Sequence, residues 1–258
     1  MPPARSLTLL GTGTSQGVPV LGCDCHVCSS PDPRDKRLRA SALLRAGNQN
    51  FIIDTGPDFR TQLLREQVDT IAGVLITHEH YDHTAGLDDL RPFCFKQKIH
   101  MPVYCLPRVA EDLRQRYAYA FSDYPGVPRL DIREVAFGDT INFGGVPIEL
   151  VEVTHGTLPI LGFRWGGIAY LTDVKILPKA TIEKCRSCAT VVISALHRVG
   201  THSHLALDDA LAYLRELEAE RGVLMHFSHR MGRTAEVDAN LPVGVQCGWD
   251  GIRLVAGC

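Results

Sequence analysis

Two hydrophobic patterns alternate along the chain. Short runs of aliphatic and β-branched residues predict strands, and between them apolar residues recur every three or four positions, as is typical of amphipathic helices. The predicted strands are SLTLLG (6–11), ALLRAG (42–47), NFIIDTG (50–56), GVLITH (73–78), PIELVEVTH (147–155), GIAYLTD (167–173), TVVISAL (190–196), GVLMHFSH (222–229) and IRLVAG (252–257).

Three stretches predict helices that cover these strands. PDFRTQLLREQ (57–67) and PRVAEDLRQRYAYAF (107–121) each begin with a proline, which fits the first turn of a helix. ALDDALAYLRELEAERG (206–222) ends at a glycine, a common helix stop. The alternation predicts an α/β fold with helices on the outer faces of mixed sheets. Since no repeat or linker divides the chain, we expect one domain over 1–258.

Composition and charge limit the classes of molecule that we expect the chain to bind. The chain has 258 residues, 45% hydrophobic and 22% charged, which is ordinary for a globular protein with a sizeable core. A net charge of −2 gives no overall attraction to nucleic acid or to a membrane surface. No apolar run reaches the roughly 20 residues of a membrane-spanning helix, and the N-terminus lacks a secretory pattern. Nine cysteines, an odd number, do not suggest a disulfide framework, so we expect a cytoplasmic protein.

The segment LITHEHYDHTAGLDDL (75–90) carries the strongest chemical signal. A hydrophobic strand runs directly into His78, His80, Asp82 and His83, four candidate metal ligands within six residues. One ion cannot easily use all four from so short a loop, whereas two adjacent ions can. The segment therefore predicts a pair of divalent cations rather than a polar loop with incidental histidines.

Later strands end in residues of the same kind. LVEVTH ends in His155, AYLTD ends in Asp173, and VLMHFSH supplies His226 and, three residues on, His229. A lone histidine near a strand end is usually a surface residue. Here each follows an apolar strand that would deliver it to one rim of the sheet, where a rigid metal site could form.

These residues resemble the metallo-β-lactamase superfamily, whose hallmark is H-x-H-x-D-H with further His, Asp and His ligands on later strands. The resemblance covers essentially the whole chain and implies an αββα sandwich of two mixed sheets flanked by helices. It also implies that His78, His80 and His155 bind one metal and that Asp82, His83 and His226 bind the other. Asp173 would bridge the two ions, as its two carboxylate oxygens allow.

A second cluster lies in GCDCHVC (22–28). Cys23, Cys25 and Cys28 are one ligand short of a tetrahedral site, and His229 is left over once His226 joins the metal pair. If the loop packs under the same rim, His229 completes a closed Cys3His site, which would hold a structural zinc. Reduced buried thiols are the alternative, but the C-x-C-x-x-C spacing favours metal.

The combination of LGTGTSQGVPVLGCDCHVC, THEHYDH, LTD and HFSH resembles the phosphoribosyl cyclic phosphodiesterases of the PhnP type. The resemblance implies two catalytic cations, zinc or manganese, one structural zinc, and hydrolysis of a small phosphodiester by a metal-bound hydroxide. Asp82 would bind metal and orient the nucleophile. His204 aligns with a histidine of that group and would be the general acid, with His202 as the other candidate.

Other functions remain open at this stage. A tRNA 3′-processing endonuclease shares the motif but usually carries a protruding arm, and no long basic insertion is present. A glyoxalase-type thioester hydrolase fits the cysteine cluster poorly. The intact H-x-H-x-D-H argues against a quinone-cofactor biosynthesis protein and against a non-catalytic metal-bound scaffold. The aromatic segment RYAYAFSDYPGVP (116–128) could form a lid, a homodimer contact or part of the core.

Overall fold

The computed structural model describes residues 5–143, 145–186 and 188–255. The strands among these residues form two sheets of seven strands each. The first sheet has the order β14-β1-β2-β3-β4-β5-β6. Its strands are β1 (Arg5–Gly11), β2 (Ser41–Ala46), β3 (Gln49–Ile53), β4 (Gly73–Leu75), β5 (Met101–Cys105), β6 (Leu130–Glu134) and β14 (Arg253–Val255). β3 to β6 pair in parallel, whereas β14, β1, β2 and β3 pair antiparallel, so the sheet is mixed.

The second sheet repeats this mixture with the order β13-β12-β11-β10-β9-β8-β7. β10 to β13 pair in parallel and β7 to β10 pair antiparallel. Its strands are β7 (Thr140–Phe143), β8 (Val146–His155), β9 (Leu158–Trp165), β10 (Ile168–Leu171), β11 (Thr190–Ser194), β12 (Arg221–Met225) and β13 (Val245–Cys247).

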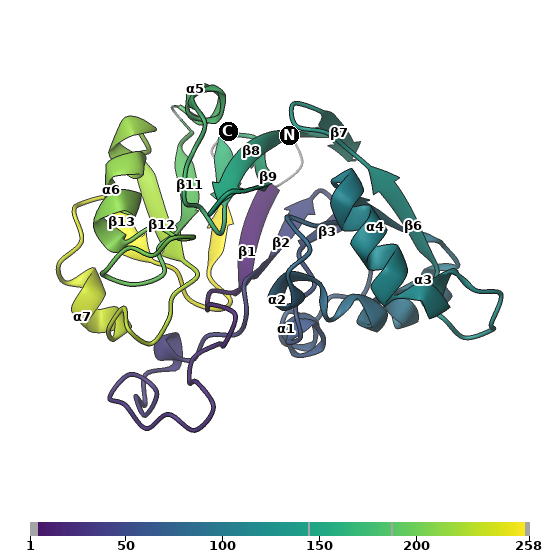
Figure 1. Ribbon diagram of the computed structural model, residues 1–258, viewed down its shortest axis with the longest axis horizontal. Coiled ribbons are helices and arrows are strands. Elements are labelled where there is room, and N and C mark those ends of the chain that lie inside the picture. Colours follow the sequence, from purple (N-terminus) through teal and green to yellow (C-terminus); the bar gives the residue numbers. More distant parts are fainter. Residues whose placement is uncertain (1–4, 144, 187, 256–258) are drawn as a thin grey trace.

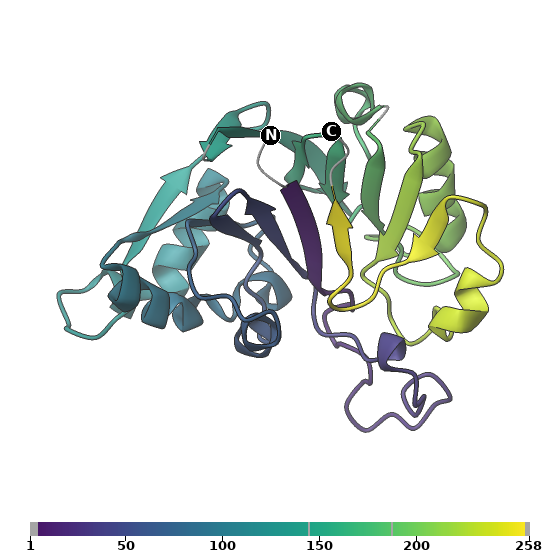
Figure 2. The same ribbon diagram turned by 180° about the vertical axis from the view of Figure 1, so that it is seen from behind.

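Helices lie on the outer side of each sheet (Figures 1 and 2). The group beside the first sheet comprises α1 (Phe59–Arg65), α2 (Tyr81–Thr84), α3 (Arg91–Gln97) and α4 (Pro107–Arg116). The group beside the second comprises α5 (Lys179–Cys185), α6 (Leu207–Glu216) and α7 (Thr234–Asp238). Short 3-10 turns occupy Pro33–Asp35, Leu87–Leu90 and Ala118–Phe121. The predicted αββα sandwich is therefore confirmed. In the described part of the chain, no helix combines the length and the apolar character needed to span a membrane.

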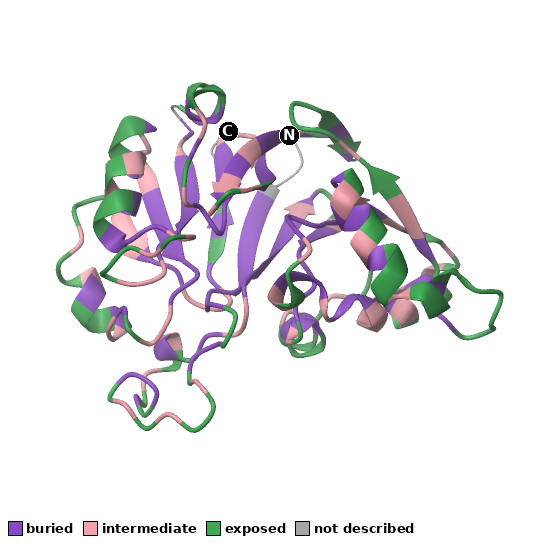
Figure 3. Cartoon of the chain, viewed as in Figure 1, coloured by how far each residue is buried: buried purple, intermediate pink, exposed green. Residues whose placement is uncertain are grey.

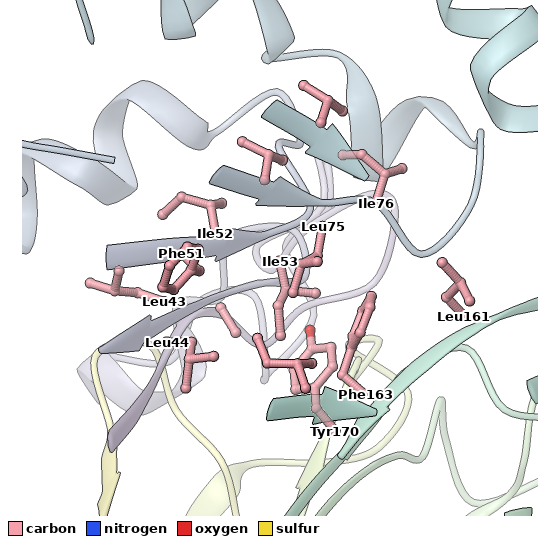
Figure 4. Packing of buried hydrophobic residues seen from close by; sticks show 14 of the residues in the cluster. Leu43, Leu44, Phe51, Ile52, Ile53, Leu75, Ile76, Leu161, Phe163 and Tyr170 are labelled. Carbon is pink, nitrogen blue, oxygen red and sulfur yellow. The ribbon is translucent and has the colours of Figure 1, made fainter. Parts of the chain in front are cut away.

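The two sheets meet in a continuous apolar core. Phe51 and Ile53 of β3 face Phe163 and Tyr170, which come from β9 and β10 of the other sheet, and all four side chains are fully buried (Figure 4). The outer faces of the helices are exposed, while the central strands are buried (Figure 3). Burying such large side chains between both sheets fixes how the sheets sit against each other.

The predicted strands all exist, but several end sooner than predicted. β3 stops at Ile53, β10 at Leu171 and β12 at Met225, because the next residues leave the sheet. Residues 256 and 257 of the last predicted strand lie outside the described residues. The prediction missed β5, β6, β7, β9 and β13. The helix predicted over 107–121 ends at Arg116, and a 3-10 turn follows at Ala118–Phe121.

Gly86 allows the H-x-H-x-D-H segment to return closely to the end of β3. Its N–H donates to the Thr55 carbonyl at 2.7 Å, and a Cβ on Gly86 would lie 2.3 Å from the Gly56 carbonyl oxygen. We expect Gly86→Ala to lower the free energy of unfolding by about 1–3 kcal/mol, because backbone must move to admit the methyl group.

Gly73→Ala is the matched control for this measurement. A Cβ on Gly73 would make only ordinary contacts, the nearest at 3.5 Å. Urea unfolding of both variants checks the prediction. Equal stability of Gly86→Ala and the parent protein would contradict the close approach.

Candidate metal centre

Several strands of both sheets end at one rim, where the backbone turns sharply. Asp54 after β3, Asp173 after β10 and His226 after β12 have φ angles of 61°, 55° and 61°. Side chains other than glycine rarely adopt this left-handed conformation, and such residues cluster at functional sites. All three side chains are buried and face the histidines of the H-x-H-x-D-H segment. The turns aim side chains from separate strands at one small volume.

The first candidate ligand group consists of His78, His80 and His155. One ligand atom from each lies within 4.8 Å of the others, and His78 Nε2 is 3.0 Å from His80 Nδ1. The His155 Nδ1 atom is 3.0 Å from the Ser203 carbonyl oxygen, to which it donates. This bond leaves Nε2 of His155 free to act as a ligand, as is common for metal-binding histidines.

The second group consists of Asp82, His83 and His226. Asp173 lies between the groups: its Oδ1 is 3.1 Å from His226 Nε2, and its Oδ2 is 3.4 Å from His83 Nε2. Asp173 also shares a further potential ligand set with His78 and His83. The His and Asp cluster is thus compatible with a binuclear metal site in which one carboxylate contacts both positions.

Buried atoms without partners support this interpretation. His83 Nε2 and both ring nitrogens of His226 are buried and form no hydrogen bond among the described residues, although Asp173 oxygens lie 3.4 Å and 3.1 Å from the two Nε2 atoms. Leaving such atoms unpaired is costly, and a bound cation would satisfy them. Burial lowers the pKa of His78 and of His226 below the ordinary value, which keeps these rings in the neutral form that binds metals.

The charges at the centre attract a cation. Burial alone would raise the pKa of Asp173, but the surrounding histidines, His226 foremost, hold that pKa well below its usual range. Burial likewise opposes a positive charge on His83, yet Asp173, Asp82 and Asp54 outweigh it and raise the pKa of that ring. The same negative charge that favours a proton on His83 would favour a divalent cation beside it.

Asp54 was not among the residues proposed from the sequence. Its Oδ2 accepts from His83 Nδ1 at 2.7 Å, and its Oδ1 accepts from the Thr77 backbone N–H at 2.8 Å. The contact fixes the ring so that Nε2 of His83 points toward Asp82 and Asp173. The signal was present in NFIIDTG, where an acidic residue ends an apolar strand as Asp173 does in AYLTD.

A cavity of about 400 Å³ opens beside the two groups. His204 lies at its wall, with Nδ1 3.8 Å from Asp173 Oδ1, and burial together with His226 lowers the pKa of His204 to about 3. His202 is exposed and lines the same cavity. The residues that line this cavity are Ser15, His80, Asp82, His155, Gly156, Thr157, Leu158, Asp173, His202, Ser203, His204 and His226.

Other residues considered from the sequence lie elsewhere. None of the described residues lining this cavity belongs to 116–128; part of that segment instead lines a separate cavity of about 480 Å³. Within it Ala120 is buried, whereas Tyr124 is 72% exposed. Arg91, which follows the H-x-H-x-D-H segment along the chain, forms an ion pair with Asp88 at 2.7 Å.

The cysteine loop meets His229 as the spacing indicated. His229 Nδ1 is 3.3 Å from Cys23 Sγ and 3.5 Å from the Sγ atoms of Cys25 and Cys28. This arrangement can hold a structural zinc, because its four donors surround one point and suit a tetrahedral thiolate site. Hydrogen bonding from the Cys28 backbone lowers the pKa of the Cys25 thiol to about 6, toward the thiolate form. The loop projects from the rim near α7 (Figure 1).

Comparisons with known proteins agree with this geometry. A family model described as a beta-lactamase superfamily domain matches residues 49–227. A crystal structure described as a new diphosphatase from the PhnP family is 36% identical and superposes with a TM-score of 0.93, covering 99% of this chain and 98% of that one.

Two curated relatives are matched over different shares of their own length. Octanoyltransferase from Porphyromonas gingivalis is 38% identical over 251 residues, but this chain spans only about half of it (51%). Ribonuclease Z from Mycobacterium sp. (strain KMS) is 26% identical, covering 93% of this chain and 81% of that protein. The first match leaves half of the relative unaccounted for, and the second is distant.

Asp54→Asn tests the orientation of His83. The neutral amide is a weaker acceptor for the His83 N–H, so we expect metal affinity or activity to fall by about 10–100-fold. Zinc content after dialysis, measured by mass spectrometry together with the melting temperature, checks this. Asp69→Asn, at an exposed carboxylate, is the control. Full metal retention and activity in Asp54→Asn would contradict the assigned contact.

Cys25→Ser tests the Cys3His group. The purified protein should carry about three divalent ions per chain, and the variant about two. We expect the melting temperature to drop by about 5 °C or more, because each kcal/mol lost shifts it by about 2–4 °C in a chain of this size. Asp24→Asn, an exposed neighbour in the same loop, should leave both quantities unchanged. Unaltered melting of Cys25→Ser would refute the structural site.

Proposed function

Because the chain belongs to the metallo-β-lactamase superfamily, we propose that it is a metal-dependent phosphodiesterase acting on small or cyclic phosphodiesters. The observation that carries the proposal is the pair of candidate ligand groups joined by Asp173 beside an open cavity. Two cations held about one bridging carboxylate suit attack on an anionic ester, because such sites stabilise both the attacking and the leaving oxygen.

We assign the metal ligands as follows. His78, His80 and His155 would hold one ion, Asp82, His83 and His226 would hold the other, and Asp173 would contribute to both. Zinc and manganese both suit this set of imidazole and carboxylate donors. When bound, the two ions neutralise the ester and lower the pKa of water so that a nucleophile is available near neutral pH. Cys23, Cys25, Cys28 and His229 hold the structural zinc in this scheme.

The chain's own side chains position the reactants. Asp82 is half-buried, with Oδ2 3.4 Å from His83 Nε2, and it lines the cavity, where its carboxylate can orient the attacking water. His204 lies at the wall and protonates the departing sugar oxygen as a general acid, a role typically worth 10²–10⁴-fold in rate. With a pKa lowered to about 3, the ring of His204 is neutral without substrate, and an incoming anion favours its protonation.

A diphosphate is the second candidate substrate. The diphosphatase from the PhnP family, at 36% identity across nearly the whole of both chains, favours it. Hydrolysis of a phosphoanhydride and of a phosphodiester both require in-line attack on phosphorus, which the same two groups would serve. The tRNA-processing alternative receives less support, because none of the described residues lining the cavity is a lysine or an arginine.

A substrate panel tests the proposal. Cyclic ribose phosphates, cyclic mononucleotides, linear dinucleotides, a nucleoside diphosphate ester, a pre-tRNA and a thioester would be compared by kcat/KM. We expect the cyclic or small phosphodiesters to be cleaved most efficiently. Preference for the pre-tRNA or the thioester would overturn the proposal, and preference for the diphosphate would select the second candidate.

Asp173→Ala provides the matched loss of function. Removing the shared carboxylate should abolish hydrolysis of bis-p-nitrophenyl phosphate while leaving the far-ultraviolet circular dichroism spectrum unchanged. Asp123→Ala, at an exposed carboxylate outside the cavity lining, is the control. Retained turnover in Asp173→Ala would refute the bridging role.

A further inference from the structure

The loop over residues 199–205, which carries His204, is held by polar contacts except at its end, where Leu205 is buried in the apolar core. Val199 is 75% exposed and the neighbouring Gly200 is exposed too, so the start of the loop lacks an apolar anchor. The turn closes on itself: the His204 N–H donates to Thr201 Oγ1 at 3.0 Å, and the Thr201 N–H donates to the His204 carbonyl at 3.4 Å. These hydrogen bonds and the buried Leu205 beside them therefore decide where the His204 ring lies.

The inner side of this turn is bound to β8. The Ser203 carbonyl accepts from His155 Nδ1 at 3.0 Å and from the Gly156 N–H at 3.3 Å. A Cβ on Gly156 would lie 3.5 Å from Ser203 Cβ, so the two segments are in van der Waals distance. These contacts, together with the Leu205 N–H, which donates to the Val174 carbonyl at 2.9 Å, hold the end of the turn near His204, and the start of the turn, at Thr201, has a separate partner.

Lys175 supplies that partner from β10's side of the rim. Its Nζ donates to the Thr201 carbonyl at 2.6 Å, and its backbone N–H donates to the Thr154 carbonyl at 2.7 Å. The side chain is half-buried and lines a cavity with Leu205 and Asp209 on the far side of the loop. Among the described residues the Lys175 ammonium forms no ion pair. Its charge is directed at a single backbone carbonyl.

We propose that Lys175 is a positioning residue, which holds the Thr201–His204 turn so that the His204 ring faces the leaving group. This inference rests on the proposed function, in which His204 is the general acid. Lys175 follows Asp173 by two residues, so one strand exit fixes both the shared carboxylate and the turn that carries the acid. A bond between a charged donor and a carbonyl is stronger than a neutral one, which suits an anchor for an exposed loop.

Leaving-group dependence distinguishes this role from a merely structural one. A departing p-nitrophenoxide needs little help from an acid, whereas phenoxide needs more. The test compares kcat for bis-p-nitrophenyl phosphate and diphenyl phosphate in zinc-loaded enzyme. In Lys175→Met we expect kcat for the phenyl ester to fall about tenfold more than kcat for the nitrophenyl ester. Lys175→Arg, which retains a charged donor, should restore most of the difference.

Two further variants separate the possible failures. Lys179→Met removes a lysine that is 91% exposed and should behave as the parent enzyme. His204→Ala should show the same selective loss as Lys175→Met, with no further loss in the double variant. If His204→Ala shows no selective loss, the general-acid role fails. If His204→Ala shows it and Lys175→Met does not, the positioning role of Lys175 is overturned.

A spectroscopic measurement applies even if neither diester is cleaved. Histidine ring resonances of the zinc-loaded protein can be assigned to His204 by their loss in His204→Ala. We expect these resonances to shift or broaden in Lys175→Met and to stay in place in Lys179→Met and Lys175→Arg. Unchanged His204 resonances in Lys175→Met would overturn the proposal independently of any activity.

Discussion

The structure depends on one contact made across the two sheets. Asp173 leaves β10 of the second sheet, and His83 follows β4 of the first, yet their side chains meet at 3.4 Å in a fully buried site. That meeting requires both sheets to pack in one relative position, which the core between β3, β9 and β10 enforces (Figure 4). The apolar interior thereby sets the geometry of a polar centre, because close packing tolerates few shifts. The distances between candidate ligands that come from different sheets follow from this arrangement.

The binuclear His and Asp cluster and the Cys3His group are also joined along the chain. His226 belongs to the binuclear cluster and His229 to the Cys3His group, with Phe227 buried between them. The Phe227 N–H donates to the Thr12 carbonyl at 2.9 Å, and the Thr14 N–H donates to the Phe227 carbonyl at 3.0 Å. The backbone at Phe227, just after β12, is therefore held through both its N–H and its carbonyl by the segment Thr12–Thr14. An ion at the Cys3His group would brace the same backbone that presents His226 to the binuclear cluster.

Sequence reasoning predicted the placement of a residue correctly where that residue directly follows a strand. His78, His155 and Asp173 each follow an apolar run, and that pattern alone indicated a common rim. It failed at Asp54, although the same pattern was present. Asp54 hydrogen-bonds the ring of His83, and a residue in that position belongs to no ligand motif with a fixed spacing. It failed at β9 because LPILGFRW carries a proline and a glycine, which weaken a strand prediction, although its pairing with β8 and β10 is local. It failed at β13 because a strand of 3 residues is too short to show a pattern. Lys175 likewise has no sequence signal, since its partner, the Thr201 carbonyl, is a backbone atom.

The left-handed backbone at Asp54, Asp173 and His226 has a consequence for how this protein can change. Each such conformation costs an L-residue about 1 kcal/mol or more relative to glycine, so the rim keeps a conformational strain that the rest of the fold must tolerate. Glycine would relax the backbone at these positions and remove the chemistry with it. Stability alone would favour glycine at these three strand exits, so the residues present there mark a trade-off between stability and reactivity.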